Sequence, residues 1–331
     1  MKNKHEELHN YIAEYQDNIS GIVAMKNGRT VYSDFWHDFK PTDTMHVMSV
    51  TKSVVSLLIG IALDLNLISD VRQSVLEFFS DYTVKRGEKT IQSVTIEHLL
   101  TMTAPYKYRS EPWTKICTSD DWTKATLDIL GGRDGINGEF RYSTLGIQIL
   151  TGILAKVSGM NTIEFANKYL FEPIGVALHH NYMANTAQEH KDFMLSKQPK
   201  ENIWFADPQG IGTAGYGLCL SVPDMAKLGQ LCLDGGLCNG KRVVSSAWIT
   251  ESTRPRYQCD KKYQNMGYGY LWWTPDIDKQ AYAALGDSGN VIYINPEHGT
   301  VVAVSGTFKP RIFDRVQFIQ NYIEPLLDSC G

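Results

Sequence analysis

The chain has 331 residues, of which 43% are hydrophobic and 21% charged, so it can bury enough core for one large domain or two ordinary ones. The formal net charge of −4 and the lack of any Lys/Arg-rich run argue against nucleic acid as a partner. Residues 1–14 show no secretion signal, and the apolar run 54–62 is too short to span a bilayer. We therefore expect a soluble, cytoplasmic protein whose six cysteines, which lack metal-type spacing, are reduced.

The first part of the chain predicts a helix, a hairpin and a buried helix. Residues 4–17 carry apolar side chains on one helical face, and residues 21–36 contain two strand-like runs. Asn27-Gly28 lies between these runs, and Asn-Gly in this position favours a tight hairpin turn. Residues 50–67 are Val, Leu, Ile and Ala on nearly every side, so we expect a helix that is buried all round.

The middle of the chain predicts helices, and its last part predicts a sheet with a closing helix. A helix is expected at residues 94–102, followed by a loop at 104–118. Further helical patterns cover residues 120–130, 145–159, 162–169, 222–234 and 246–252. Alternating apolar residues predict strands at residues 267–274, 281–285, 291–295 and 300–305. A helix is expected to follow them at residues 311–327.

This order of elements predicts an α+β fold. Strands near both ends should form one antiparallel sheet flanked by the N- and C-terminal helices, with a mainly helical domain inserted between its halves. We expect a discontinuous sheet domain of residues 1–62 and 265–331 and a helical domain of residues 63–264. The buried helix that begins near Ser49 should lie at their junction, where we expect the active site.

Ser49 and Lys52 are the first candidates for chemistry. They lie one helical turn apart at the start of the expected buried helix, so they share a face. Burying an ammonium group costs several kcal/mol unless a partner compensates it, which gives Lys52 a reason other than packing to be there. A serine at the positive end of a helix dipole, with an amine near enough to take its proton, is typical of a nucleophile. Because Ser-x-x-Lys arises by chance about once in a chain of this size, partners elsewhere are needed to support this interpretation.

Other motifs carry weaker signals. Tyr142 lies at a loop-to-helix junction, where catalytic groups are often held, although a buried structural tyrosine gives the same pattern. The stretch 285–290, between two expected strands, is typical of a hairpin turn. Residues 210–215 match G-x-G-x-x-G, but no apolar strand precedes them, which argues against a dinucleotide site. The histidines lack carboxylates at ligand spacing, so we expect solvated side chains rather than a metal site at His5, His9, His179, His180 and His190.

Three motifs, taken together and in order, carry a resemblance to a known family. Ser49-Val50-Thr51-Lys52, Tyr142-Ser143-Thr144 and Asp287-Ser288-Gly289 resemble the active-site motifs of the serine β-lactamase and penicillin-binding protein superfamily. The chain is most similar to the class C β-lactamase-like branch, which includes esterases, D,D-peptidases and amide hydrolases. The resemblance runs from about residue 20 to the C-terminus and includes the segments 94–103, 170–175, 217–228, 239–241 and 268–273.

Two residues depart from the family pattern. The second motif ends in Thr144 instead of Asn, so it lacks the side-chain amide that in the family contacts the substrate and the lysine. The third motif begins with Asp287 instead of Lys or His, so a carboxylate replaces a positive or neutral group. Because an ionised Asp287 would repel a substrate carboxylate, we expect weak activity on β-lactams and a preference for neutral or amine-bearing esters and amides. The alternative is that Asp287 only shapes the turn, or points away and is paired with a nearby Lys or Arg.

The resemblance implies two-step acyl transfer on a small-molecule ester or amide. Ser49 would form the acyl-enzyme, Lys52 and Tyr142 would share the proton transfers, and either of the two is a candidate base. The backbone N–H groups of Ser49 and Asn290 would form the oxyanion hole. No metal or organic cofactor is expected, and the substrate would be contacted by the remaining motif residues, Thr144, Asp287, Ser288 and Gly289.

Two alternatives stay open at this point. One is a true class C-type β-lactamase or D,D-carboxypeptidase, that is, a penicillin-binding protein. The other is a non-catalytic relative that binds a ligand, which the two departures would allow. The presence of Ser49, Lys52 and Tyr142 together argues against the second, because loss of catalysis would leave no reason to keep all three. The sequence gives no indication of an oligomeric state.

Overall fold

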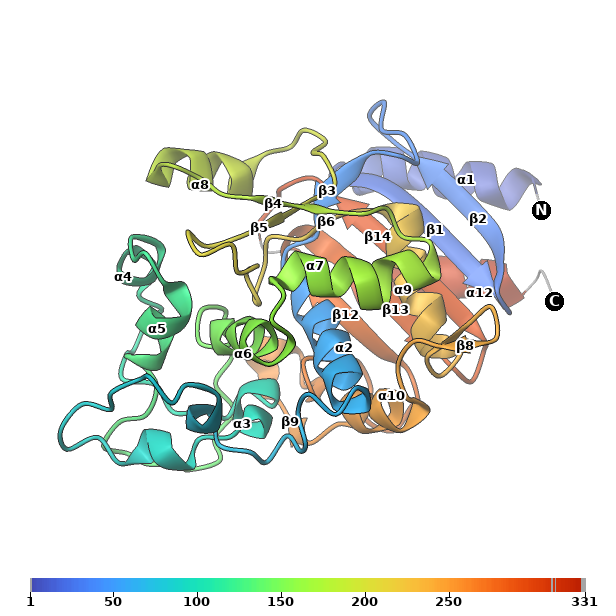
Figure 1. Cartoon of the computed structure of the whole chain (residues 1–331). Helices are drawn as coiled ribbons and strands as arrows, with labels where there is room; N and C mark the ends of the chain where they lie inside the picture. The colour runs from blue at the N-terminus through green and yellow to red at the C-terminus, as the bar shows by residue number, and fades with distance from the viewer. Residues whose placement is uncertain (1, 311, 313, 329–331) are drawn as a thin grey trace.

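The computed structural model describes residues 2–310, 312 and 314–328, and its centre is an eight-stranded antiparallel sheet (Figure 1). The strand order is β2-β1-β14-β13-β12-β11-β10-β9, so strands from the start of the chain lie beside strands from its end. This order confirms the predicted α+β fold with one sheet built from both ends. The strands are β1 (Ile19–Lys26), β2 (Arg29–Phe35), β9 (Tyr257–Gln258), β10 (Gly267–Tyr268), β11 (Trp273–Thr274), β12 (Tyr282–Gly286), β13 (Asn290–Asn295) and β14 (Thr300–Gly306).

The hairpin predicted near the N-terminus joins β1 to β2. Asn27 and Gly28 have φ angles of 49° and 76°, the left-handed values that a tight hairpin turn requires. On its other side β1 pairs with β14, from Ile19 opposite Gly306 to Lys26 opposite Thr300. The two ends of the chain are therefore held together in the middle of the sheet.

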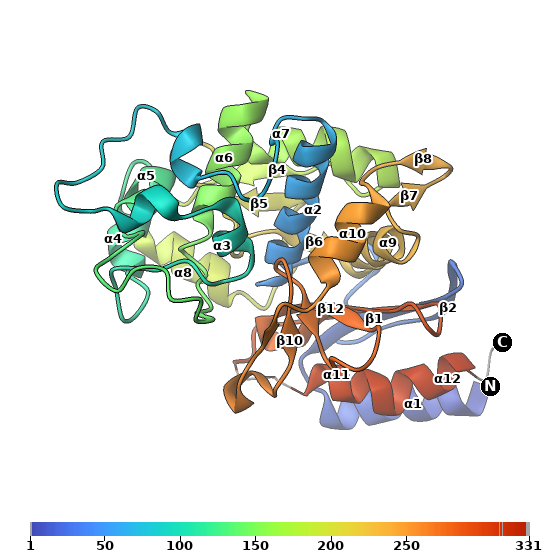
Figure 2. The same cartoon turned by 90° about the horizontal axis from the view of Figure 1, so that it is seen from below.

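The terminal helices cover one face of the sheet (Figure 2). They are α1 (Lys2–Tyr15), α11 (Arg315–Phe318) and α12 (Glu324–Asp328), with a π-helical turn between the last two. Tyr11 of α1 stacks on Tyr322 of that turn, with ring centroids 4.6 Å apart. The closing helix was predicted from Arg311, which lies outside the described residues, and the described helix begins at Arg315.

The helices α2 (Val50–Asp64) and α9 (Val222–Leu233) lie on the opposite face (Figure 2). All residues of α2 from Val50 to Ala62 are buried, which confirms the helix that was expected to be buried all round, although it ends three residues earlier than predicted. In α9, a Cβ at Gly229 would lie 2.5 Å from Cγ1 of Val301 on β14. A glycine is therefore needed for this helix to approach the sheet so closely.

The chain between α2 and β9 is mainly helical. Short two-stranded pairings connect it, and one of them, β3 with β6, brings the segment before Ser49 next to the segment before α9. The elements not yet given are β3 (Thr44–His46), η1 (Val75–Phe78), η2 (Thr90–Ser93), α3 (Ile96–Leu100), α4 (Trp113–Cys117), α5 (Trp122–Leu127), α6 (Gln148–Ser158), α7 (Thr162–Ala166), η3 (Asn167–Phe171), η4 (Glu172–Ile174), β4 (His180–Tyr182), α8 (Ala187–Leu195), β5 (Ile203–Phe205), β6 (Cys219–Ser221), β7 (Leu237–Cys238), β8 (Lys241–Arg242), α10 (Ser246–Thr253) and η5 (Lys261–Tyr263).

Two predicted elements are wrong in detail, and one helix was not predicted. The single strand expected at 267–274 is two short strands, β10 and β11, that pair with each other, because the chain turns at Leu271, whose φ is 62°. The expected loop at 104–118 contains the helix α4, and the helix α8 was not predicted. Both helices are short or largely polar, so the apolar periodicity that reveals a longer helix is weak in them.

The predicted division into a sheet domain (1–62 with 265–331) and a helical domain (63–264) stays a prediction. Seven strands of the sheet come from the two outer segments, whereas the edge strand β9 (Tyr257–Gln258) lies inside the range assigned to the helical domain. Within the described part of the chain, every helix is too short or too polar to cross a membrane.

Candidate active site

Ser49 lies at the N-cap position of α2, directly after a sharp turn of the backbone. The preceding residue, Met48, has a φ of 52°, which is an uncommon conformation for a residue with a side chain. The Ser49 side chain makes no capping hydrogen bond and is half-buried. Its hydroxyl is therefore available for contacts other than those of a helix cap.

Lys52 extends along the first turn of α2 to this hydroxyl. Its Nζ is 2.8 Å from Oγ of Ser49, and it donates a 2.6 Å hydrogen bond to the carbonyl oxygen of Gly215. The side chain is only 2% exposed, and within the described residues no carboxylate forms an ion pair with it. Burial lowers the pKa of Lys52 to about 7, against an opposing effect of the Glu111 carboxylate. The amine is therefore able to be neutral near physiological pH.

Tyr142 packs against the same amine. Nζ of Lys52 lies 4.8 Å from the centre of the Tyr142 ring, and Trp273 stacks on the ring with centroids 5.8 Å apart. Burial raises the pKa of Tyr142, while hydrogen bonding to Ser49 works in the opposite direction. Its hydroxyl is consequently protonated at neutral pH. The three residues of the first two motifs that were predicted to act together are thus brought together by the fold.

The third motif lies beside the start of α2. The turn at Asp287–Gly289 joins β12 to β13, as expected for a hairpin, with φ angles of 65° at Ser288 and 76° at Gly289. At Gly286, the last residue of β12, a Cβ would be 2.3 Å from the carbonyl oxygen of Val47 and 3.2 Å from Cβ of Met48. The hairpin end therefore touches the two residues that precede Ser49.

Asp287 is exposed, and its carboxylate is oriented by its own turn. Oδ1 accepts a 2.8 Å hydrogen bond from the backbone N–H of Ser288. Among the described residues no Lys or Arg forms an ion pair with it, and its charge contributes to raising the pKa of Tyr142. An uncompensated negative charge therefore lies within electrostatic reach of the candidate site.

Asn290 and Thr144 complete the set of predicted residues. The buried Asn290 begins β13, and its side chain donates to the carbonyl of Asp287 and accepts from the N–H of Gly306 at 3.1 Å. Oγ1 of Thr144 is 3.4 Å from Nζ of Lys52, so a contact to the lysine is kept although the amide of the family pattern is missing. Both residues lie at the site where the motif order placed them.

A buried polar network that the sequence did not reveal supports the third motif. Nδ2 of Asn18 donates to the carbonyl of Ser288 at 2.8 Å, and Oδ1 of Asn18 accepts from Arg315 at 3.0 Å. Arg315 is 2% exposed, burial lowers its pKa to about 10, and its guanidinium packs directly on Gly289. The turn between β12 and β13 is therefore held in place by Asn18 and Arg315, which come from opposite ends of the chain.

Glu111 is the second functional candidate that sequence reasoning missed. Its Oε1 accepts hydrogen bonds from the hydroxyl of Ser143 at 2.7 Å and from the N–H of Leu145 at 2.9 Å. This carboxylate therefore holds the segment that carries Tyr142. It also raises the pKa of Lys52, which means that it stabilises the protonated amine. No sequence pattern around Glu111 indicates these roles, because Ser143 and Leu145 are more than thirty residues away from it.

The described residues contain no group of three or more His, Cys, Asp or Glu that could hold a metal ion. The solvated position expected for the histidines is wrong for His179, which is buried, and both His179 and His190 form structural hydrogen bonds. Nε2 of His179 lies 2.6 Å from the carbonyl of Cys219, and Nε2 of His190 lies 3.0 Å from the hydroxyl of Tyr216. A third, His9, pairs with Asp34 at 2.7 Å.

The chain is similar in sequence and fold to known hydrolases. A 6-aminohexanoate-dimer hydrolase of Paenarthrobacter ureafaciens is 23% identical over 310 residues, which cover 87% of this chain and 72% of that protein. Similar folds occur in a class C β-lactamase of Rhodobacter sphaeroides (TM-score 0.70, 17% identity, 98% of this chain and 99% of that one) and in a family VIII carboxylesterase (TM-score 0.71, 15% identity, 97% and 96%). The β-lactamase family model matches residues 8–317. The chain therefore belongs to the β-lactamase family, whose fold is shared by these hydrolases.

Proposed function

We propose that this protein is a serine hydrolase that cleaves a small ester or amide through an acyl-enzyme on Ser49. The observation that carries the proposal is the 2.8 Å contact between Oγ of Ser49 and Nζ of Lys52, a buried amine with a pKa of about 7. Such an amine is neutral in a large fraction of molecules at physiological pH and can accept the serine proton. An ordinary surface lysine, with a pKa near 10, would be protonated almost completely.

In this proposal Lys52 is the base and Tyr142 relays the proton. Oγ of Ser49 attacks the carbonyl carbon while its proton moves to Nζ of Lys52, and the resulting ammonium is stabilised by the Gly215 carbonyl and the Tyr142 ring. Because burial raises its pKa, Tyr142 is protonated and can donate to the leaving group, regaining a proton from Lys52. Water then attacks the acyl-enzyme by the same steps in reverse order.

The oxyanion hole in this proposal consists of the backbone N–H groups of Ser49 and Asn290. The first lies at the N-terminus of α2, where backbone N–H groups have no partner within the helix. The second lies at the start of β13, directly after the turn that touches the residues before Ser49. A donor of this kind is worth about 3 to 4 kcal/mol of transition-state stabilisation.

The charges around Tyr142 favour neutral or amine-bearing substrates. Asp287 and Glu111 both contribute to raising the pKa of Tyr142, so two carboxylates act on the site electrostatically. A substrate carboxylate near either would be repelled, and a substrate amine would be attracted. We therefore propose weak activity on penicillins and cephalosporins. The relative from P. ureafaciens is named for a dimer of 6-aminohexanoate, an amino acid with both an amino group and a carboxylate, so its name supports an amide substrate but favours neither charge.

Intact mass spectrometry after treatment with a fluorophosphonate tests the nucleophile, with Ser49→Ala as the matched control. Hydrolysis of neutral, anionic and cationic p-nitrophenyl esters and of a chromogenic cephalosporin tests the substrate class in the same preparation. Stoichiometric labelling with slow cephalosporin turnover supports the proposal. Efficient cephalosporin turnover would instead favour a true β-lactamase, and no labelling with no turnover would favour a non-catalytic relative.

A cytoplasmic location is part of the proposal. It is supported by the five described cysteines, Cys117, Cys219, Cys232, Cys238 and Cys259, which are all free thiols, as expected in a reducing compartment. Mass measurement of alkylated protein prepared without reductant tests this point, because thiols that are free in the cell take up the alkylating reagent.

A further inference from the structure

A cavity of about 1320 Å³ lies beside the candidate active site and does not include Ser49, Lys52 or Tyr142 in its lining. Three segments form it, residues 85–90, 103–109 and 128–141, with Lys115 at one side. Its volume exceeds that of most small-molecule sites, which are typically about 300 to 1,000 Å³. It is therefore large enough for an organic ligand and not only for a single ion.

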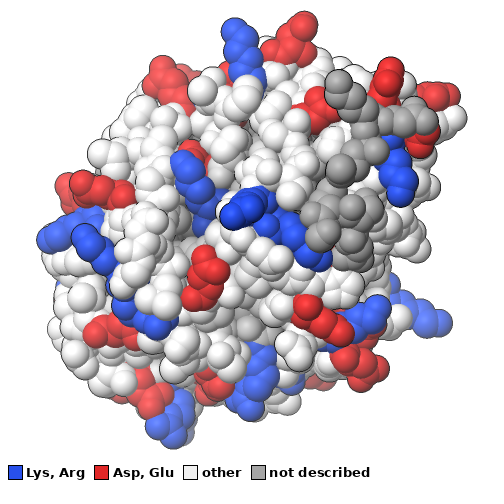
Figure 3. All heavy atoms as spheres, turned by 90° about the vertical axis from the view of Figure 1, so that its right-hand side faces the viewer, with Lys and Arg blue, Asp and Glu red and all other residues white. Residues whose placement is uncertain are grey.

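The lining is positively charged although the chain as a whole is not. Eight Lys or Arg face four Asp or Glu in the cavity, a net charge of +4, whereas the whole chain has a net charge of −4. Elsewhere the two signs are mixed, as on the face shown in Figure 3, where Lys and Arg are interspersed with Asp and Glu. The positive charge is thus concentrated in a concave place, where its field acts most strongly on an incoming anion.

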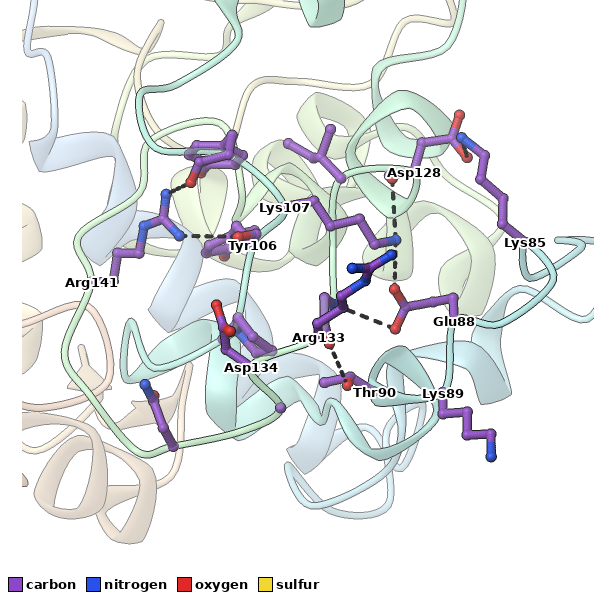
Figure 4. Close-up of a pocket in the computed structure, with 18 of the residues that line it drawn as sticks. Lys85, Glu88, Lys89, Thr90, Tyr106, Lys107, Asp128, Arg133, Asp134 and Arg141 are labelled. Carbon is purple, nitrogen blue, oxygen red and sulfur yellow. Dashed lines mark hydrogen bonds and ion pairs between the residues drawn. The ribbon is translucent and has the colours of Figure 1, made fainter.

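Three of the eight cations have a structural role (Figure 4). Lys107 pairs with Glu88 at 3.0 Å, and Lys85 lies 3.5 Å from Asp128. The guanidinium of Arg141 donates to two backbone carbonyls and packs over two tyrosine rings. Among the described residues no acid forms an ion pair with the other five, which are all exposed: Arg86, Lys89, Arg109, Lys115 and Arg133.

The base of the cavity is fixed by contacts that join its segments. The carboxylate of Glu88 accepts from the N–H of Gly132 at 3.4 Å, and the hydroxyl of Thr90 donates to the carbonyl of Gly132 at 2.7 Å (Figure 4). Gly131 has a φ of 90°, and a Cβ there would lie 2.5 Å from Oε1 of Glu88, so only glycine fits. The N–H of Lys107 bonds to the carbonyl of Ile129 at 2.9 Å. The unpaired cations are therefore carried by segments that hydrogen bonds join to one another, rather than by independent loops.

We propose that this cavity binds a small molecule that carries at least two phosphate or carboxylate groups. The five unpaired cations come from three separate segments, so one monovalent anion cannot contact them all, whereas a ligand with several anionic groups can. Three of them are Arg, whose planar guanidinium binds phosphate and carboxylate through two parallel hydrogen bonds. The site is distinct from the acylation site, since its lining does not include Ser49, Lys52 or Tyr142.

Isothermal titration of the full chain with inorganic pyrophosphate and, separately, with citrate tests the proposal. We expect saturable binding of at least one of the two at low salt, weakened at physiological ionic strength because these cations are exposed. The two arms distinguish phosphate from carboxylate as the preferred group. The titration requires no catalysis, so it gives an answer even if Ser49 is not the nucleophile, and binding should be unchanged in Ser49→Ala.

The decisive variant replaces three unpaired cations, Arg86→Gln, Lys89→Gln and Arg133→Gln. Its matched control, Lys191→Gln, Lys241→Gln and Lys261→Gln, changes the net charge equally at exposed positions outside the cavity. We expect affinity to fall by at least about tenfold in the first and by less than about twofold in the second, because only the first removes charge-assisted hydrogen bonds to the ligand. Should the first variant fail to fold, Arg109→Gln with Lys115→Gln tests the other side of the cavity.

Three results would overturn the proposal. The first is no saturable binding of pyrophosphate or citrate at low salt. The second is an equal loss of affinity in the cavity variant and in the control, which would show that overall charge and not the cavity is responsible. The third is tight binding of a single-stranded RNA oligonucleotide with no binding of either small anion, which would make the surface a nucleic-acid site instead.

Discussion

Replacing Lys52 by Met should abolish turnover and at the same time stabilise the fold. Burial lowers the pKa of Lys52 from 10.5 to about 7, and this difference corresponds to about 5 kcal/mol of unfavourable interaction with the charged amine. Methionine has a similar length and no charge. It loses the hydrogen bond to the Gly215 carbonyl, and a buried carbonyl without a partner costs roughly 1 to 3 kcal/mol. The net gain in unfolding free energy at pH 7 should therefore be about 2 kcal/mol or more.

The gain should depend on pH in a defined direction. In the folded wild type the amine binds a proton only below about pH 7, whereas in the unfolded chain it does so up to about pH 10.5. Between these values the unfolded state carries more protons, so wild-type stability rises with pH. Lys52→Met lacks this contribution. Its advantage over the wild type should be largest at or below pH 7 and should shrink by about 2 to 3 kcal/mol between pH 7 and pH 9.

Urea denaturation of the wild type and Lys52→Met at pH 6, 7, 8 and 9 measures this difference, with the exposed Lys241→Met as a control that should show no pH-dependent gain. The same pKa predicts that kcat/KM of the wild type on a neutral ester rises to half its maximum near pH 7. A stability difference that is constant across the pH range, or a kcat/KM that is still rising steeply at pH 9, would show that the pKa of Lys52 is not lowered to about 7.

Three further predictions concern the rest of the site. Lys52→Ala and Tyr142→Phe should each lower kcat by at least about 100-fold, and the double variant should cost far less than the product of the two, since they act on one proton path; near-full activity of Tyr142→Phe on an unactivated amide would place the relay elsewhere. Asp287→Asn should raise kcat/KM for anionic relative to cationic esters at low salt by about tenfold, and an unchanged ratio would contradict its electrostatic role. Asn18→Ala removes the hydrogen bonds that join Ser288 to Arg315, so kcat should fall by about tenfold or more and fluorophosphonate labelling of the folded protein should be slower. An unchanged kcat would show that other contacts hold the hairpin.

Features that depend on neighbouring residues could be predicted from the sequence. The Asn27-Gly28 turn follows from the left-handed φ angles that a tight hairpin demands. The start of α9 follows from the Ser221 side chain, which accepts from the N–H of Asp224 as a helix cap does. The buried α2 follows from its unbroken apolar composition, and the burial of Lys52 follows from its place in that helix.

Features that depend on distant residues could not be predicted in the same way. The carbonyl of Gly215 is 163 residues from Lys52, and it lies in a glycine-rich stretch whose only motif match, a dinucleotide loop, was rejected because no apolar strand precedes it. The bond from Asn18 to Ser288 spans 270 residues, and neither residue carries a pattern that indicates it. That Ser49, Tyr142 and the third motif meet was expected only from the family resemblance, because no periodicity relates segments so far apart.

Peptide mapping after fluorophosphonate labelling tests directly whether Ser49 is the nucleophile. We expect one adduct per chain, located on Ser49, formed at a rate that rises with pH through about pH 7 as Lys52 loses its proton, and absent from Ser49→Ala. An adduct on another residue, or an adduct that survives in folded Ser49→Ala, would contradict it.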